Sequence, residues 1–408
     1  MFRAYYFSEM PYPNPPEFEF TDVIRVNMPN RWLDPDTTCQ AYDKYLDLIR
    51  AADELGLDIM FNEHHQTMSN LVPGMPLIMA VAARETKKCR LLALGNPVTN
   101  RPDPVRVAAE MAMIDSLSHG RLDCGFVRGA FFELPSTNAR PTDMIPRLYE
   151  AIDLIVKAWT SHDGPFNWEG EFFHHREVNI VPRPYQQPHP PIWVSTSSVS
   201  STIPIAERGY VAGTIFVGTE KCKALFDAYR QTYEKTFGRQ PHPDRLAYSS
   251  FVFVGDTDEE ALNEAPKIQD FLRQSARHPS GTADIPGFYD APTRAAMLKA
   301  EEENPGSVFK MGKQIALTPP ERLIDAGSGF YGSPDSVFEQ LKYLFHELDG
   351  FGHFIGMFQG SNMSYALTTK SMKLFAEQVL PRFREEVYEP FLKERGLKRL
   401  LLPAGAKA

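Results

Sequence analysis

Short apolar runs alternate with amphipathic stretches along most of the chain. The amphipathic stretches repeat apolar residues three or four positions apart, as Val107, Met111 and Ile114 do, which predicts helices with one buried face. The apolar runs between them are rich in aromatic and branched residues, which predicts buried strands. The predicted strands are Phe2–Phe7, Leu57–Phe61, Leu91–Gly95, Leu122–Val127, Ile192–Ser195, Tyr210–Phe216, Leu246–Val254 and Phe351–Phe358. The predicted helices are Thr38–Leu55, Met75–Arg84, Asp103–Ser118, Ile145–Trp159, Ser200–Arg208, Lys221–Phe237, Asp258–Arg273 and Ser364–Val387.

Eight strands in alternation with helices predict an α/β fold of the (β/α)8, or TIM, barrel type. A doubly wound parallel sheet is the alternative, but no G-x-G-x-x-G motif opens any of the predicted strand–helix units. The alternation lapses between Gln274 and Asp325, where proline and glycine recur. Because long irregular insertions in compact domains are usually functional, we expect residues 1–408 to form a single barrel domain in which residues 274–325 are an active-site lid before the eighth strand.

The composition narrows the class of protein. Of the 408 residues, 43% are hydrophobic and 12% aromatic, which is ordinary for a globular protein with a large core. Lys and Arg number 43 against 52 for Asp and Glu, and the net charge of -9 disfavours nucleic acid or an anionic membrane as the main partner. The four cysteines form no C-x-x-C motif, which fits a reducing compartment. The N-terminal apolar run is too short for a signal peptide and no stretch approaches a membrane span, so we expect a cytoplasmic protein.

Two adjacent histidines, His64 and His65, follow the second predicted strand, at the end of a barrel where chemistry is usually found. Adjacent residues that leave a strand point in opposite directions, so the two rings are not expected to bind one metal ion together. No H-E-x-x-H motif is present either, and we expect no metal site. A structural role is the usual one for a single histidine. The strand-end position instead favours one of the two as a neutral general base at the barrel mouth.

Arg128 follows the fourth predicted strand, where an unpaired guanidinium would be costly to bury. An internal salt bridge is one explanation, and a phosphate held by the guanidinium is the other. The hydroxyl-rich run Ser195–Thr202 stands just before a predicted helix, and helix N-termini with exposed N–H groups bind anions. Together these residues favour one phosphate monoester, such as that of FMN.

Two nucleotide or hydrolase motifs are excluded. The stretch Gly306–Lys313 resembles a P-loop, but five residues separate its glycines instead of four, and Gln314 stands where Ser or Thr is required. No G-x-S-x-G motif marks a hydrolase nucleophile.

Together these motifs resemble the bacterial luciferase-like, flavin-dependent monooxygenase family over nearly the whole chain. The matching stretches are Phe61–His65, Pro104–Arg106, Asp115–Arg121, Val127–Gly129, Ala206–Gly209 and Tyr331–Pro334. Their order and spacing are similar to those of the luciferase catalytic subunit. The resemblance implies a barrel that binds reduced flavin at its carboxyl-terminal mouth.

The resemblance also implies roles for individual residues. His64 matches the catalytic histidine, and Arg128 matches the arginine that contacts the flavin phosphate. Gly95 and Asn96 match a position where a non-proline cis peptide lies behind the flavin ring. The phosphate-binding segment after the fifth strand matches Ser197, Ser198 and Ser201, and the mobile active-site loop matches Lys310 and Lys313.

Two departures weaken any expectation of light emission. Val127 stands where luciferase has a reactive cysteine, and Ser197 replaces an acidic residue. The implied activity is therefore that of a flavin-dependent monooxygenase which oxygenates a small organic substrate through a C4a-(hydro)peroxyflavin formed from FMNH2 and O2. The resemblance further implies a separate NAD(P)H:flavin reductase that supplies the FMNH2, and a homodimer.

Other functions remain open from the sequence. The same fold serves F420-dependent oxidoreductases that transfer hydride without oxygen, and it serves non-catalytic flavin-binding subunits of heteromeric complexes. His64 and the loop lysines speak against a non-catalytic subunit. A metal-dependent barrel hydrolase is disfavoured because the chain lacks a credible ligand set.

Overall fold

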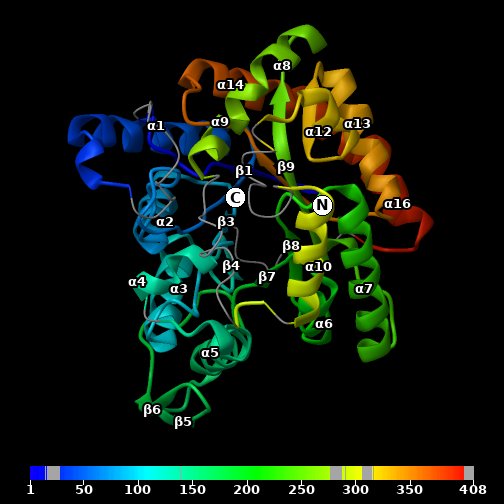
Figure 1. Cartoon of the computed structure of the whole chain (residues 1–408). Helices are drawn as coiled ribbons and strands as arrows, with labels where there is room; N and C mark the ends of the chain where they lie inside the picture. Colours follow the sequence, from blue (N-terminus) through cyan, green and yellow to red (C-terminus); the bar gives the residue numbers. More distant parts are fainter. Residues whose placement is uncertain are drawn as a thin grey trace.

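The structure is a computed structural model, and it describes residues 1–13, 15, 28–137, 139–275, 287–289, 291–305, 315 and 317–398. Within these residues, parallel strands close into a barrel surrounded by helices (Figure 1). Each barrel strand pairs with the next in chain order, and the pairs β8–β9, β9–β11 and β11–β1 close the ring. The eight barrel strands are β1 (Arg3–Phe7), β2 (Asp58–Met60), β3 (Leu91–Leu92), β4 (Leu122–Phe126), β7 (Ile192–Thr196), β8 (Val211–Thr214), β9 (Leu246–Val254) and β11 (His353–Met357). The predicted (β/α)8 barrel and all its predicted strands are confirmed.

The helices between the strands also follow the prediction. Helix α1 begins one turn earlier than expected because the Asp34 carboxylate accepts the backbone N–H of Thr37 at 2.7 Å, and Pro35 is the first helical residue. The helices that follow successive barrel strands are α1 (Pro35–Glu54), α2 (Met75–Glu85), α3 (Pro104–Leu117), α5 (Met144–Thr160), α6 (Val199–Glu207), α7 (Thr219–Phe237), α8 (Asp258–Glu264), α9 (Pro266–Ser275) and α14 (Tyr365–Leu374). The C-terminal helical run continues from α14 through α15 (Leu380–Phe383) to α16 (Glu389–Glu394), past the predicted end at Val387. No described helix is long and apolar enough to cross a membrane.

Several elements were not predicted. A hairpin of β5 (Phe166–Glu169) and β6 (His174–Val178) follows α5, and most of its side chains are exposed, so it lacks the apolar signature of a barrel strand. The strand β10 (Gly329–Gly332) pairs with the end of β9 outside the barrel, and α13 (Pro334–Glu347) follows it. The expected lapse at 274–325 contains α10 (Ala291–Glu303) and α12 (Pro320–Asp325).

The segment Gly327–Gly332 has the spacing G-x-G-x-x-G, which marks a nucleotide-binding turn only when it lies between a strand and a helix. Here its last two glycines are the ends of β10 and pair with Phe251 and Val254 of β9. The glycines therefore belong to the strand itself, and the segment is not a phosphate-binding turn.

The barrel has an apolar interior and an apolar outer layer. Alternate residues of a strand face opposite sides, so Tyr5 joins Trp193, Phe251 and Ile355 inside the barrel, whereas Tyr6 packs in the layer beneath the helices. Both layers are almost fully buried, which fixes the positions of the strand ends.

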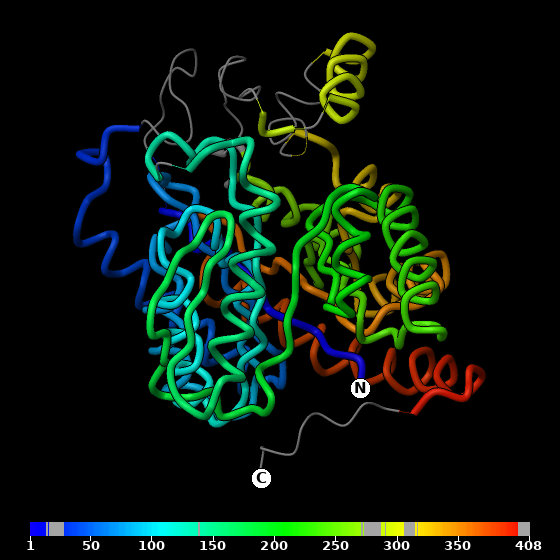
Figure 2. The backbone as a smooth tube through the Cα atoms, turned by 90° about the horizontal axis from the view of Figure 1, so that it is seen from below, coloured from blue at the N-terminus to red at the C-terminus, as the bar shows by residue number. Residues whose placement is uncertain are grey.

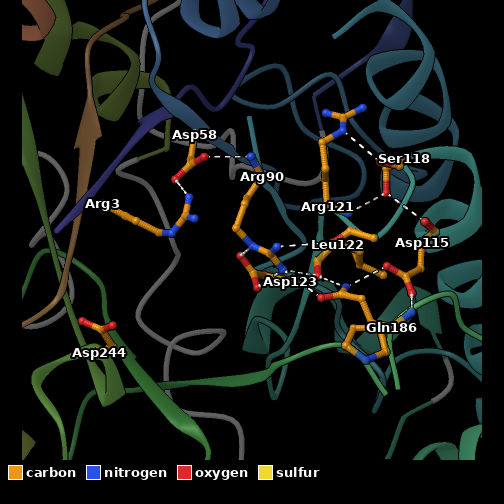
Figure 3. A network of polar contacts seen from close by, with 12 residues as sticks. Arg3, Asp58, Arg90, Asp115, Ser118, Arg121, Leu122, Asp123, Gln186 and Asp244 are labelled. Carbon is orange, nitrogen blue, oxygen red and sulfur yellow. Dashed lines mark hydrogen bonds and ion pairs between the residues drawn. The ribbon is translucent and has the colours of Figure 1, made fainter. Parts of the chain in front are cut away.

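Buried charges connect the strands at the amino-terminal end of the barrel (Figure 3). The Arg90 guanidinium donates two hydrogen bonds of 2.7 Å to the Asp123 carboxylate, and Arg3 contacts Asp58 at 2.6 Å. Gln186 joins this network by donating to Asp115 at 2.7 Å and accepting from Arg90. These contacts hold together the beginnings of β1 to β4.

Part of the motif Asp115–Arg121, which carries much of the family resemblance, lies in this network. Arg121 donates to the carbonyl oxygens of Ala83, Thr86 and Cys89 and thereby fixes the turn between α2 and β3. His119 and Gly120 have φ of 55° and 82°, the left-handed conformation that a tight turn requires. This motif is therefore structural.

The described part of the insertion lies at the opposite end of the barrel. Figure 2 shows the N-terminus at one end of the molecule and α10, in yellow, beyond the other end. Since β1 begins at the N-terminus, α10 lies at the end to which the strands point, which is the mouth of the barrel.

Candidate active site

The mouth brings together segments that follow four neighbouring strands. The order β1–β2–β3–β4 in the sheet places Glu9, His64, Asn96 and Arg128 after successive neighbours. Because parallel neighbours end at the same side of the barrel, these residues share the mouth although they are far apart in sequence. The predicted location of the site is therefore consistent with the observed topology.

His64 and His65 contact the same carboxylate. The Nδ1 atom of His64 lies 2.7 Å from Oε1 of Glu133, and the Nδ1 atom of His65 lies 2.8 Å from Oε2. The expectation that the two rings point in opposite directions is wrong. Strand β2 ends at Met60, so the alternation of side chains no longer applies at these positions, and Gln66 takes a left-handed φ of 57° directly after them.

Glu133 is a buried charge at the centre of this cluster, with 1% of its surface exposed. Burial by itself raises the pKa of the carboxyl, but hydrogen bonds from His64 and His65 outweigh burial and lower the pKa to about 2. The hydrogen bond that His65 donates to Glu133, followed by the one that it donates to Glu63, raises the pKa of His65 to about 9 in spite of desolvation. At neutral pH, Glu133 is an anion and His65 a cation.

A second carboxylate extends the cluster toward α2 and α3. Glu63 lies 3.2 Å from Nε2 of His65 and 2.7 Å from Nη2 of Arg101, and it accepts the backbone N–H of Met75 at 2.9 Å. Burial opposes the ionised form, but His65 and Arg101 lower the pKa of Glu63 below its ordinary value. Arg101 continues to Glu110 of α3 at 2.8 Å, so opposite charges alternate from the mouth to the helix layer.

Glu9 stands on the other side of His64. Its Oε2 atom accepts hydrogen bonds from the side-chain amides of Asn62 at 2.9 Å and Asn70 at 2.8 Å. The same oxygen lies 3.9 Å from Nε2 of His64, which is too long for a hydrogen bond. His64 is thus held at Nδ1, and its Nε2 atom faces a fixed carboxylate across a gap.

Gly95 and Asn96 follow β3 at the mouth. A Cβ atom on Gly95 would lie 2.6 Å from the Cβ of Asn62, so only glycine allows this close approach. The implied cis peptide is not found, because the described cis bonds are Val181–Pro182 and Gln187–Pro188. A non-proline cis bond costs about 3 kcal/mol, and the chain turns here in the trans form.

The side chain of Asn96 is fully buried, and neither of its amide atoms has a hydrogen-bond partner among the described residues. An unpaired buried amide costs about 1–3 kcal/mol, which makes it a candidate contact for a ligand. The backbone oxygen of Asn96 accepts the N–H of Val127 at 3.0 Å, so the ends of β3 and β4 are connected.

Arg128 lies against the described part of the insertion. Its guanidinium carbon is 3.7 Å from the centre of the Phe288 ring, and Nη1 donates to the Phe288 carbonyl at 3.2 Å. Phe288 packs with Leu134 and Met144 in a small apolar cluster that is separate from the barrel core. The insertion therefore reaches the arginine that was predicted to hold a phosphate.

The serine run follows β7, the neighbour of β4. Phe126, the last residue of β4, pairs with Val194 of β7, so the segments that carry Arg128 and the serine run follow neighbouring strand ends. Ser198 and Ser201 form a reciprocal capping box at the start of α6, and Ser197 is exposed. The structure thus places the predicted phosphate ligands on adjacent strand ends, with two of the three hydroxyls already used to cap the helix.

Two further predictions concern the lysines of the active-site loop and the absence of a metal site. Lys310 and Lys313 lie outside the described residues. Within the described part of the chain, no three His, Cys, Asp or Glu side chains are grouped to hold a metal ion.

Sequence reasoning did not select Glu9, Glu63, Asn70, Arg101 or Glu133. Glu63 directly precedes His64 in the sequence, and this adjacency could have indicated that it belongs to the site. Nothing local distinguishes Glu133 from other glutamates, because its partners lie almost 70 residues away.

The raised pKa of His65 makes stability depend on pH. The folded-state pKa of about 9 exceeds the ordinary value of about 6.5, so the charged ring stabilises the fold fully below pH 6.5 and this contribution is lost as the pH rises through 9. In the parent, this contribution should lower the free energy of unfolding by an amount on the order of 2–3 kcal/mol between about pH 6 and pH 10. We expect His65→Gln to lack this decrease. Urea unfolding of both proteins at several pH values measures this difference. His174→Gln, which alters an exposed pair with Glu169, is the control. If the free energy of unfolding of His65→Gln falls with pH as steeply as that of the parent, the assignment is wrong.

Comparison with known proteins agrees with the fold and the motifs. A family model for luciferase-like monooxygenases matches residues 25–350. The chain is 27% identical over 368 residues to the oxygenase component of flavin-dependent trigonelline monooxygenase from Acinetobacter baylyi, a match that covers 87% of this chain and 93% of that protein.

Solved structures share the barrel. The oxygenating constituent of 3,6-diketocamphane monooxygenase from Pseudomonas putida, a type II Baeyer–Villiger monooxygenase in complex with FMN, has a TM-score of 0.68 at 21% identity and covers 94% of this chain and 98% of its own. The coenzyme F420-dependent tetrahydromethanopterin reductase from Methanopyrus kandleri has a TM-score of 0.61 at 17% identity, with 84% and 96% covered. These two likenesses show the fold. Because the family model covers most of the chain, the protein belongs to the luciferase-like monooxygenase family, an oxidoreductase family.

Proposed function

We propose that this protein is a flavin-dependent monooxygenase that uses externally supplied FMNH2 and O2 to oxygenate a small organic substrate. The observation that carries the proposal is the placement of His64, Asn96 and Arg128 after the adjacent strands β2, β3 and β4, beside the serine-rich end of β7. A relative that is 27% identical is an oxygenase component of a flavin-dependent monooxygenase, and a structural neighbour contains FMN.

The residues at the mouth fit a flavin mononucleotide. Arg128 and the N-terminus of α6, with Ser197, Ser198 and Ser201, would hold the phosphate, because a guanidinium and helix N–H groups favour an anion. Gly95 would let the turn after β3 pack closely on Asn62, and the unpaired amide of the next residue, Asn96, would satisfy one polar edge of the ring. Reduced FMN, when bound, supplies the electrons that activate O2.

The chain's own contribution is proton control and exclusion of water. His64 lies at the mouth with Nδ1 held by Glu133, and its Nε2 atom is placed to accept or return a proton. Phe131, Phe132 and Phe288 form an aromatic wall between His64 and Arg128 that would keep water from the reacting groups. The insertion 274–325, whose Phe288 covers Arg128, would act as the lid, with Lys310 and Lys313 on it.

The reducing equivalents would come from a separate NAD(P)H:flavin reductase. The G-x-G-x-x-G segment of this chain lies in a paired strand and offers no turn for a dinucleotide. The relatives named above are the oxygenase component and the oxygenating constituent of their systems, which supports the same division of labour here.

The proposed cofactor and reaction are tested together by anaerobic titration with FMNH2 and with reduced F420, followed by mixing with O2. We expect FMNH2 to bind and a transient absorbance distinct from both reduced and oxidised FMN to appear. The variant His64→Ala should bind FMNH2 within about threefold of the parent but lose roughly 100-fold or more in turnover, because acid–base catalysis contributes about that much. Preferential binding of reduced F420 without an oxygen-dependent transient would overturn the proposal in favour of hydride transfer.

Arg128 provides a test of the phosphate site. We expect Arg128→Ala to weaken FMNH2 binding by roughly 10- to 100-fold, because a charge-assisted hydrogen bond in a partly dry mouth is lost. Reduced riboflavin lacks the phosphate, and its affinity should change less than about threefold. Equal losses for both ligands, measured by anaerobic titration, would mean that Arg128 only supports Phe288 and the lid.

The exposed apolar residues of two neighbouring helices support a homodimer. Leu77 and Val81 lie one turn apart on α2, Met113 and Leu117 lie one turn apart on α3, and all four are exposed, Leu77 by 77%. We expect the chain to sediment as a dimer and the variant Leu77→Glu/Met113→Glu to shift toward monomer. Tyr365→Glu, at an exposed aromatic residue of α14, is the control, and a monomeric parent would exclude the dimer.

A further inference from the structure

Glu133 is shared by two adjacent imidazole rings, which is an unusual use of a buried carboxylate. Each of its oxygens lies within 2.8 Å of the Nδ1 atom of one ring, and the carboxylate is 1% exposed. It comes from the short 3-10 turn Phe131–Glu133 after β4, whereas both rings follow β2. The contact therefore connects two separate segments of the mouth.

The protonation states follow from donor and acceptor counting. An ionised carboxylate only accepts hydrogen bonds, so both Nδ1 atoms must carry a proton. His65 also meets the Glu63 carboxylate at 3.2 Å through Nε2, so that nitrogen carries a proton as well. His65 is thus an imidazolium between two anions, in agreement with its raised pKa.

His64 has a different environment at its second nitrogen. Its Nδ1 proton is committed to Glu133, and its Nε2 atom has only the Glu9 carboxylate at 3.9 Å, beyond hydrogen-bonding distance. Glu9 cannot turn freely toward the ring, because Asn62 and Asn70 hold it. In the neutral form of His64, the free lone pair is therefore on Nε2, and 22% of the side chain is exposed.

The charged groups that face this pair come from each neighbouring segment. Glu9 follows β1, Glu63 follows β2, and Arg101 follows β3 and pairs with Glu63 at 2.7 Å. Arg101 neutralises Glu63, so His65 remains as the cation that balances Glu133. The carboxylate can stay ionised in a buried site because its counter-ion is built in.

We propose that Glu133 is a positioning residue that fixes His64 with its proton on Nδ1 and its proton-accepting nitrogen Nε2 toward the mouth, and that His65 is the permanent counter-ion of Glu133. This inference rests on the proposed function for its consequence in turnover. The arrangement itself does not depend on any flavin or substrate. Of two neighbouring histidines, only one is then free to exchange a proton, and the other keeps the carboxylate charged.

The test observes the histidine ring nitrogens by NMR in the full-length protein without flavin. The signals of His64 and His65 are assigned by their loss in His64→Gln and His65→Gln. We expect the neutral form of His64 in the parent to carry its proton on Nδ1. In Glu133→Ala this preference should disappear, with the proton found mainly on Nε2.

Two further variants separate geometry from charge. Glu133→Gln keeps an oxygen that can accept from His64 but removes the charge, so His64 should keep its Nδ1 proton while His65 becomes neutral at about pH 8, where the parent ring is charged. Glu63→Gln is the matched control, because it touches His65 but not His64, and should leave the His64 proton on Nδ1. Thermal unfolding of each variant reports whether it is folded.

The outcomes distinguish this inference from the proposed function. If Glu133→Ala retains the Nδ1 proton of His64, the positioning role is wrong, whatever the enzyme does. If that variant does not fold, the decision rests on Glu133→Gln, and a His65 that still titrates near pH 9 overturns the pairing.

If the proton shifts as expected, kcat in Glu133→Ala should fall roughly 100-fold with FMNH2 affinity within about threefold, and Glu133→Gln should recover part of that loss. A parent that shows the Nδ1 proton but never oxygenates a substrate would overturn the proposed function and leave the positioning role intact.

Discussion

A charge that is buried in a protein must be given its partners within the structure, and this constraint shapes both ends of the barrel. At the amino-terminal end, Arg90 donates two hydrogen bonds to Asp123 and so connects the starts of β3 and β4. At the mouth, Glu133 is the central buried charge of a second network, and it connects the segments after β4 and β2. Removal of one partner from such a pair costs about 3–5 kcal/mol, because the remaining charge is left buried without a partner.

The two networks have different consequences for function. Arg90 donates to the Asp123 carboxylate and to the backbone carbonyl of Leu122, and this buried pair is closed on itself. Glu133 is also fully paired, but one of its partners, His64, retains a second nitrogen that no described residue satisfies at hydrogen-bonding distance. The mouth therefore ends its network of charges on a histidine ring with one nitrogen left for a further partner, whereas the network at the amino-terminal end is closed.

The sequence allowed the barrel to be predicted because strands that are buried on both faces are nearly continuous apolar runs, as Leu246–Val254 is except at Ser249 and Ser250. Strand β10 was missed because two of its four residues are glycine, and the β5–β6 hairpin was missed because most of its side chains are exposed. The placement of His64 and Arg128 at the same end of the barrel followed from the order of the strands alone. The shared contact with Glu133 could not be predicted, since a buried glutamate has no local signature and its partners are distant in sequence. The motif Asp115–Arg121 carried the family resemblance, yet its side chains maintain the fold rather than the chemistry.

The apolar packing beside the turn that carries Glu133 is separate from the core of the barrel. Leu134, Met144 and Phe288 form their own apolar cluster, which does not merge with the interior or the outer layer of the barrel. Neither the two clusters of the barrel core nor the network around Arg90 includes these residues. The position of His64, in contrast, depends on Glu133, which directly precedes Leu134 in the chain. A change of side chain in this cluster therefore keeps the position of His64 only where it leaves the backbone of the turn Phe131–Glu133 in place, because Glu133 and Leu134 are consecutive.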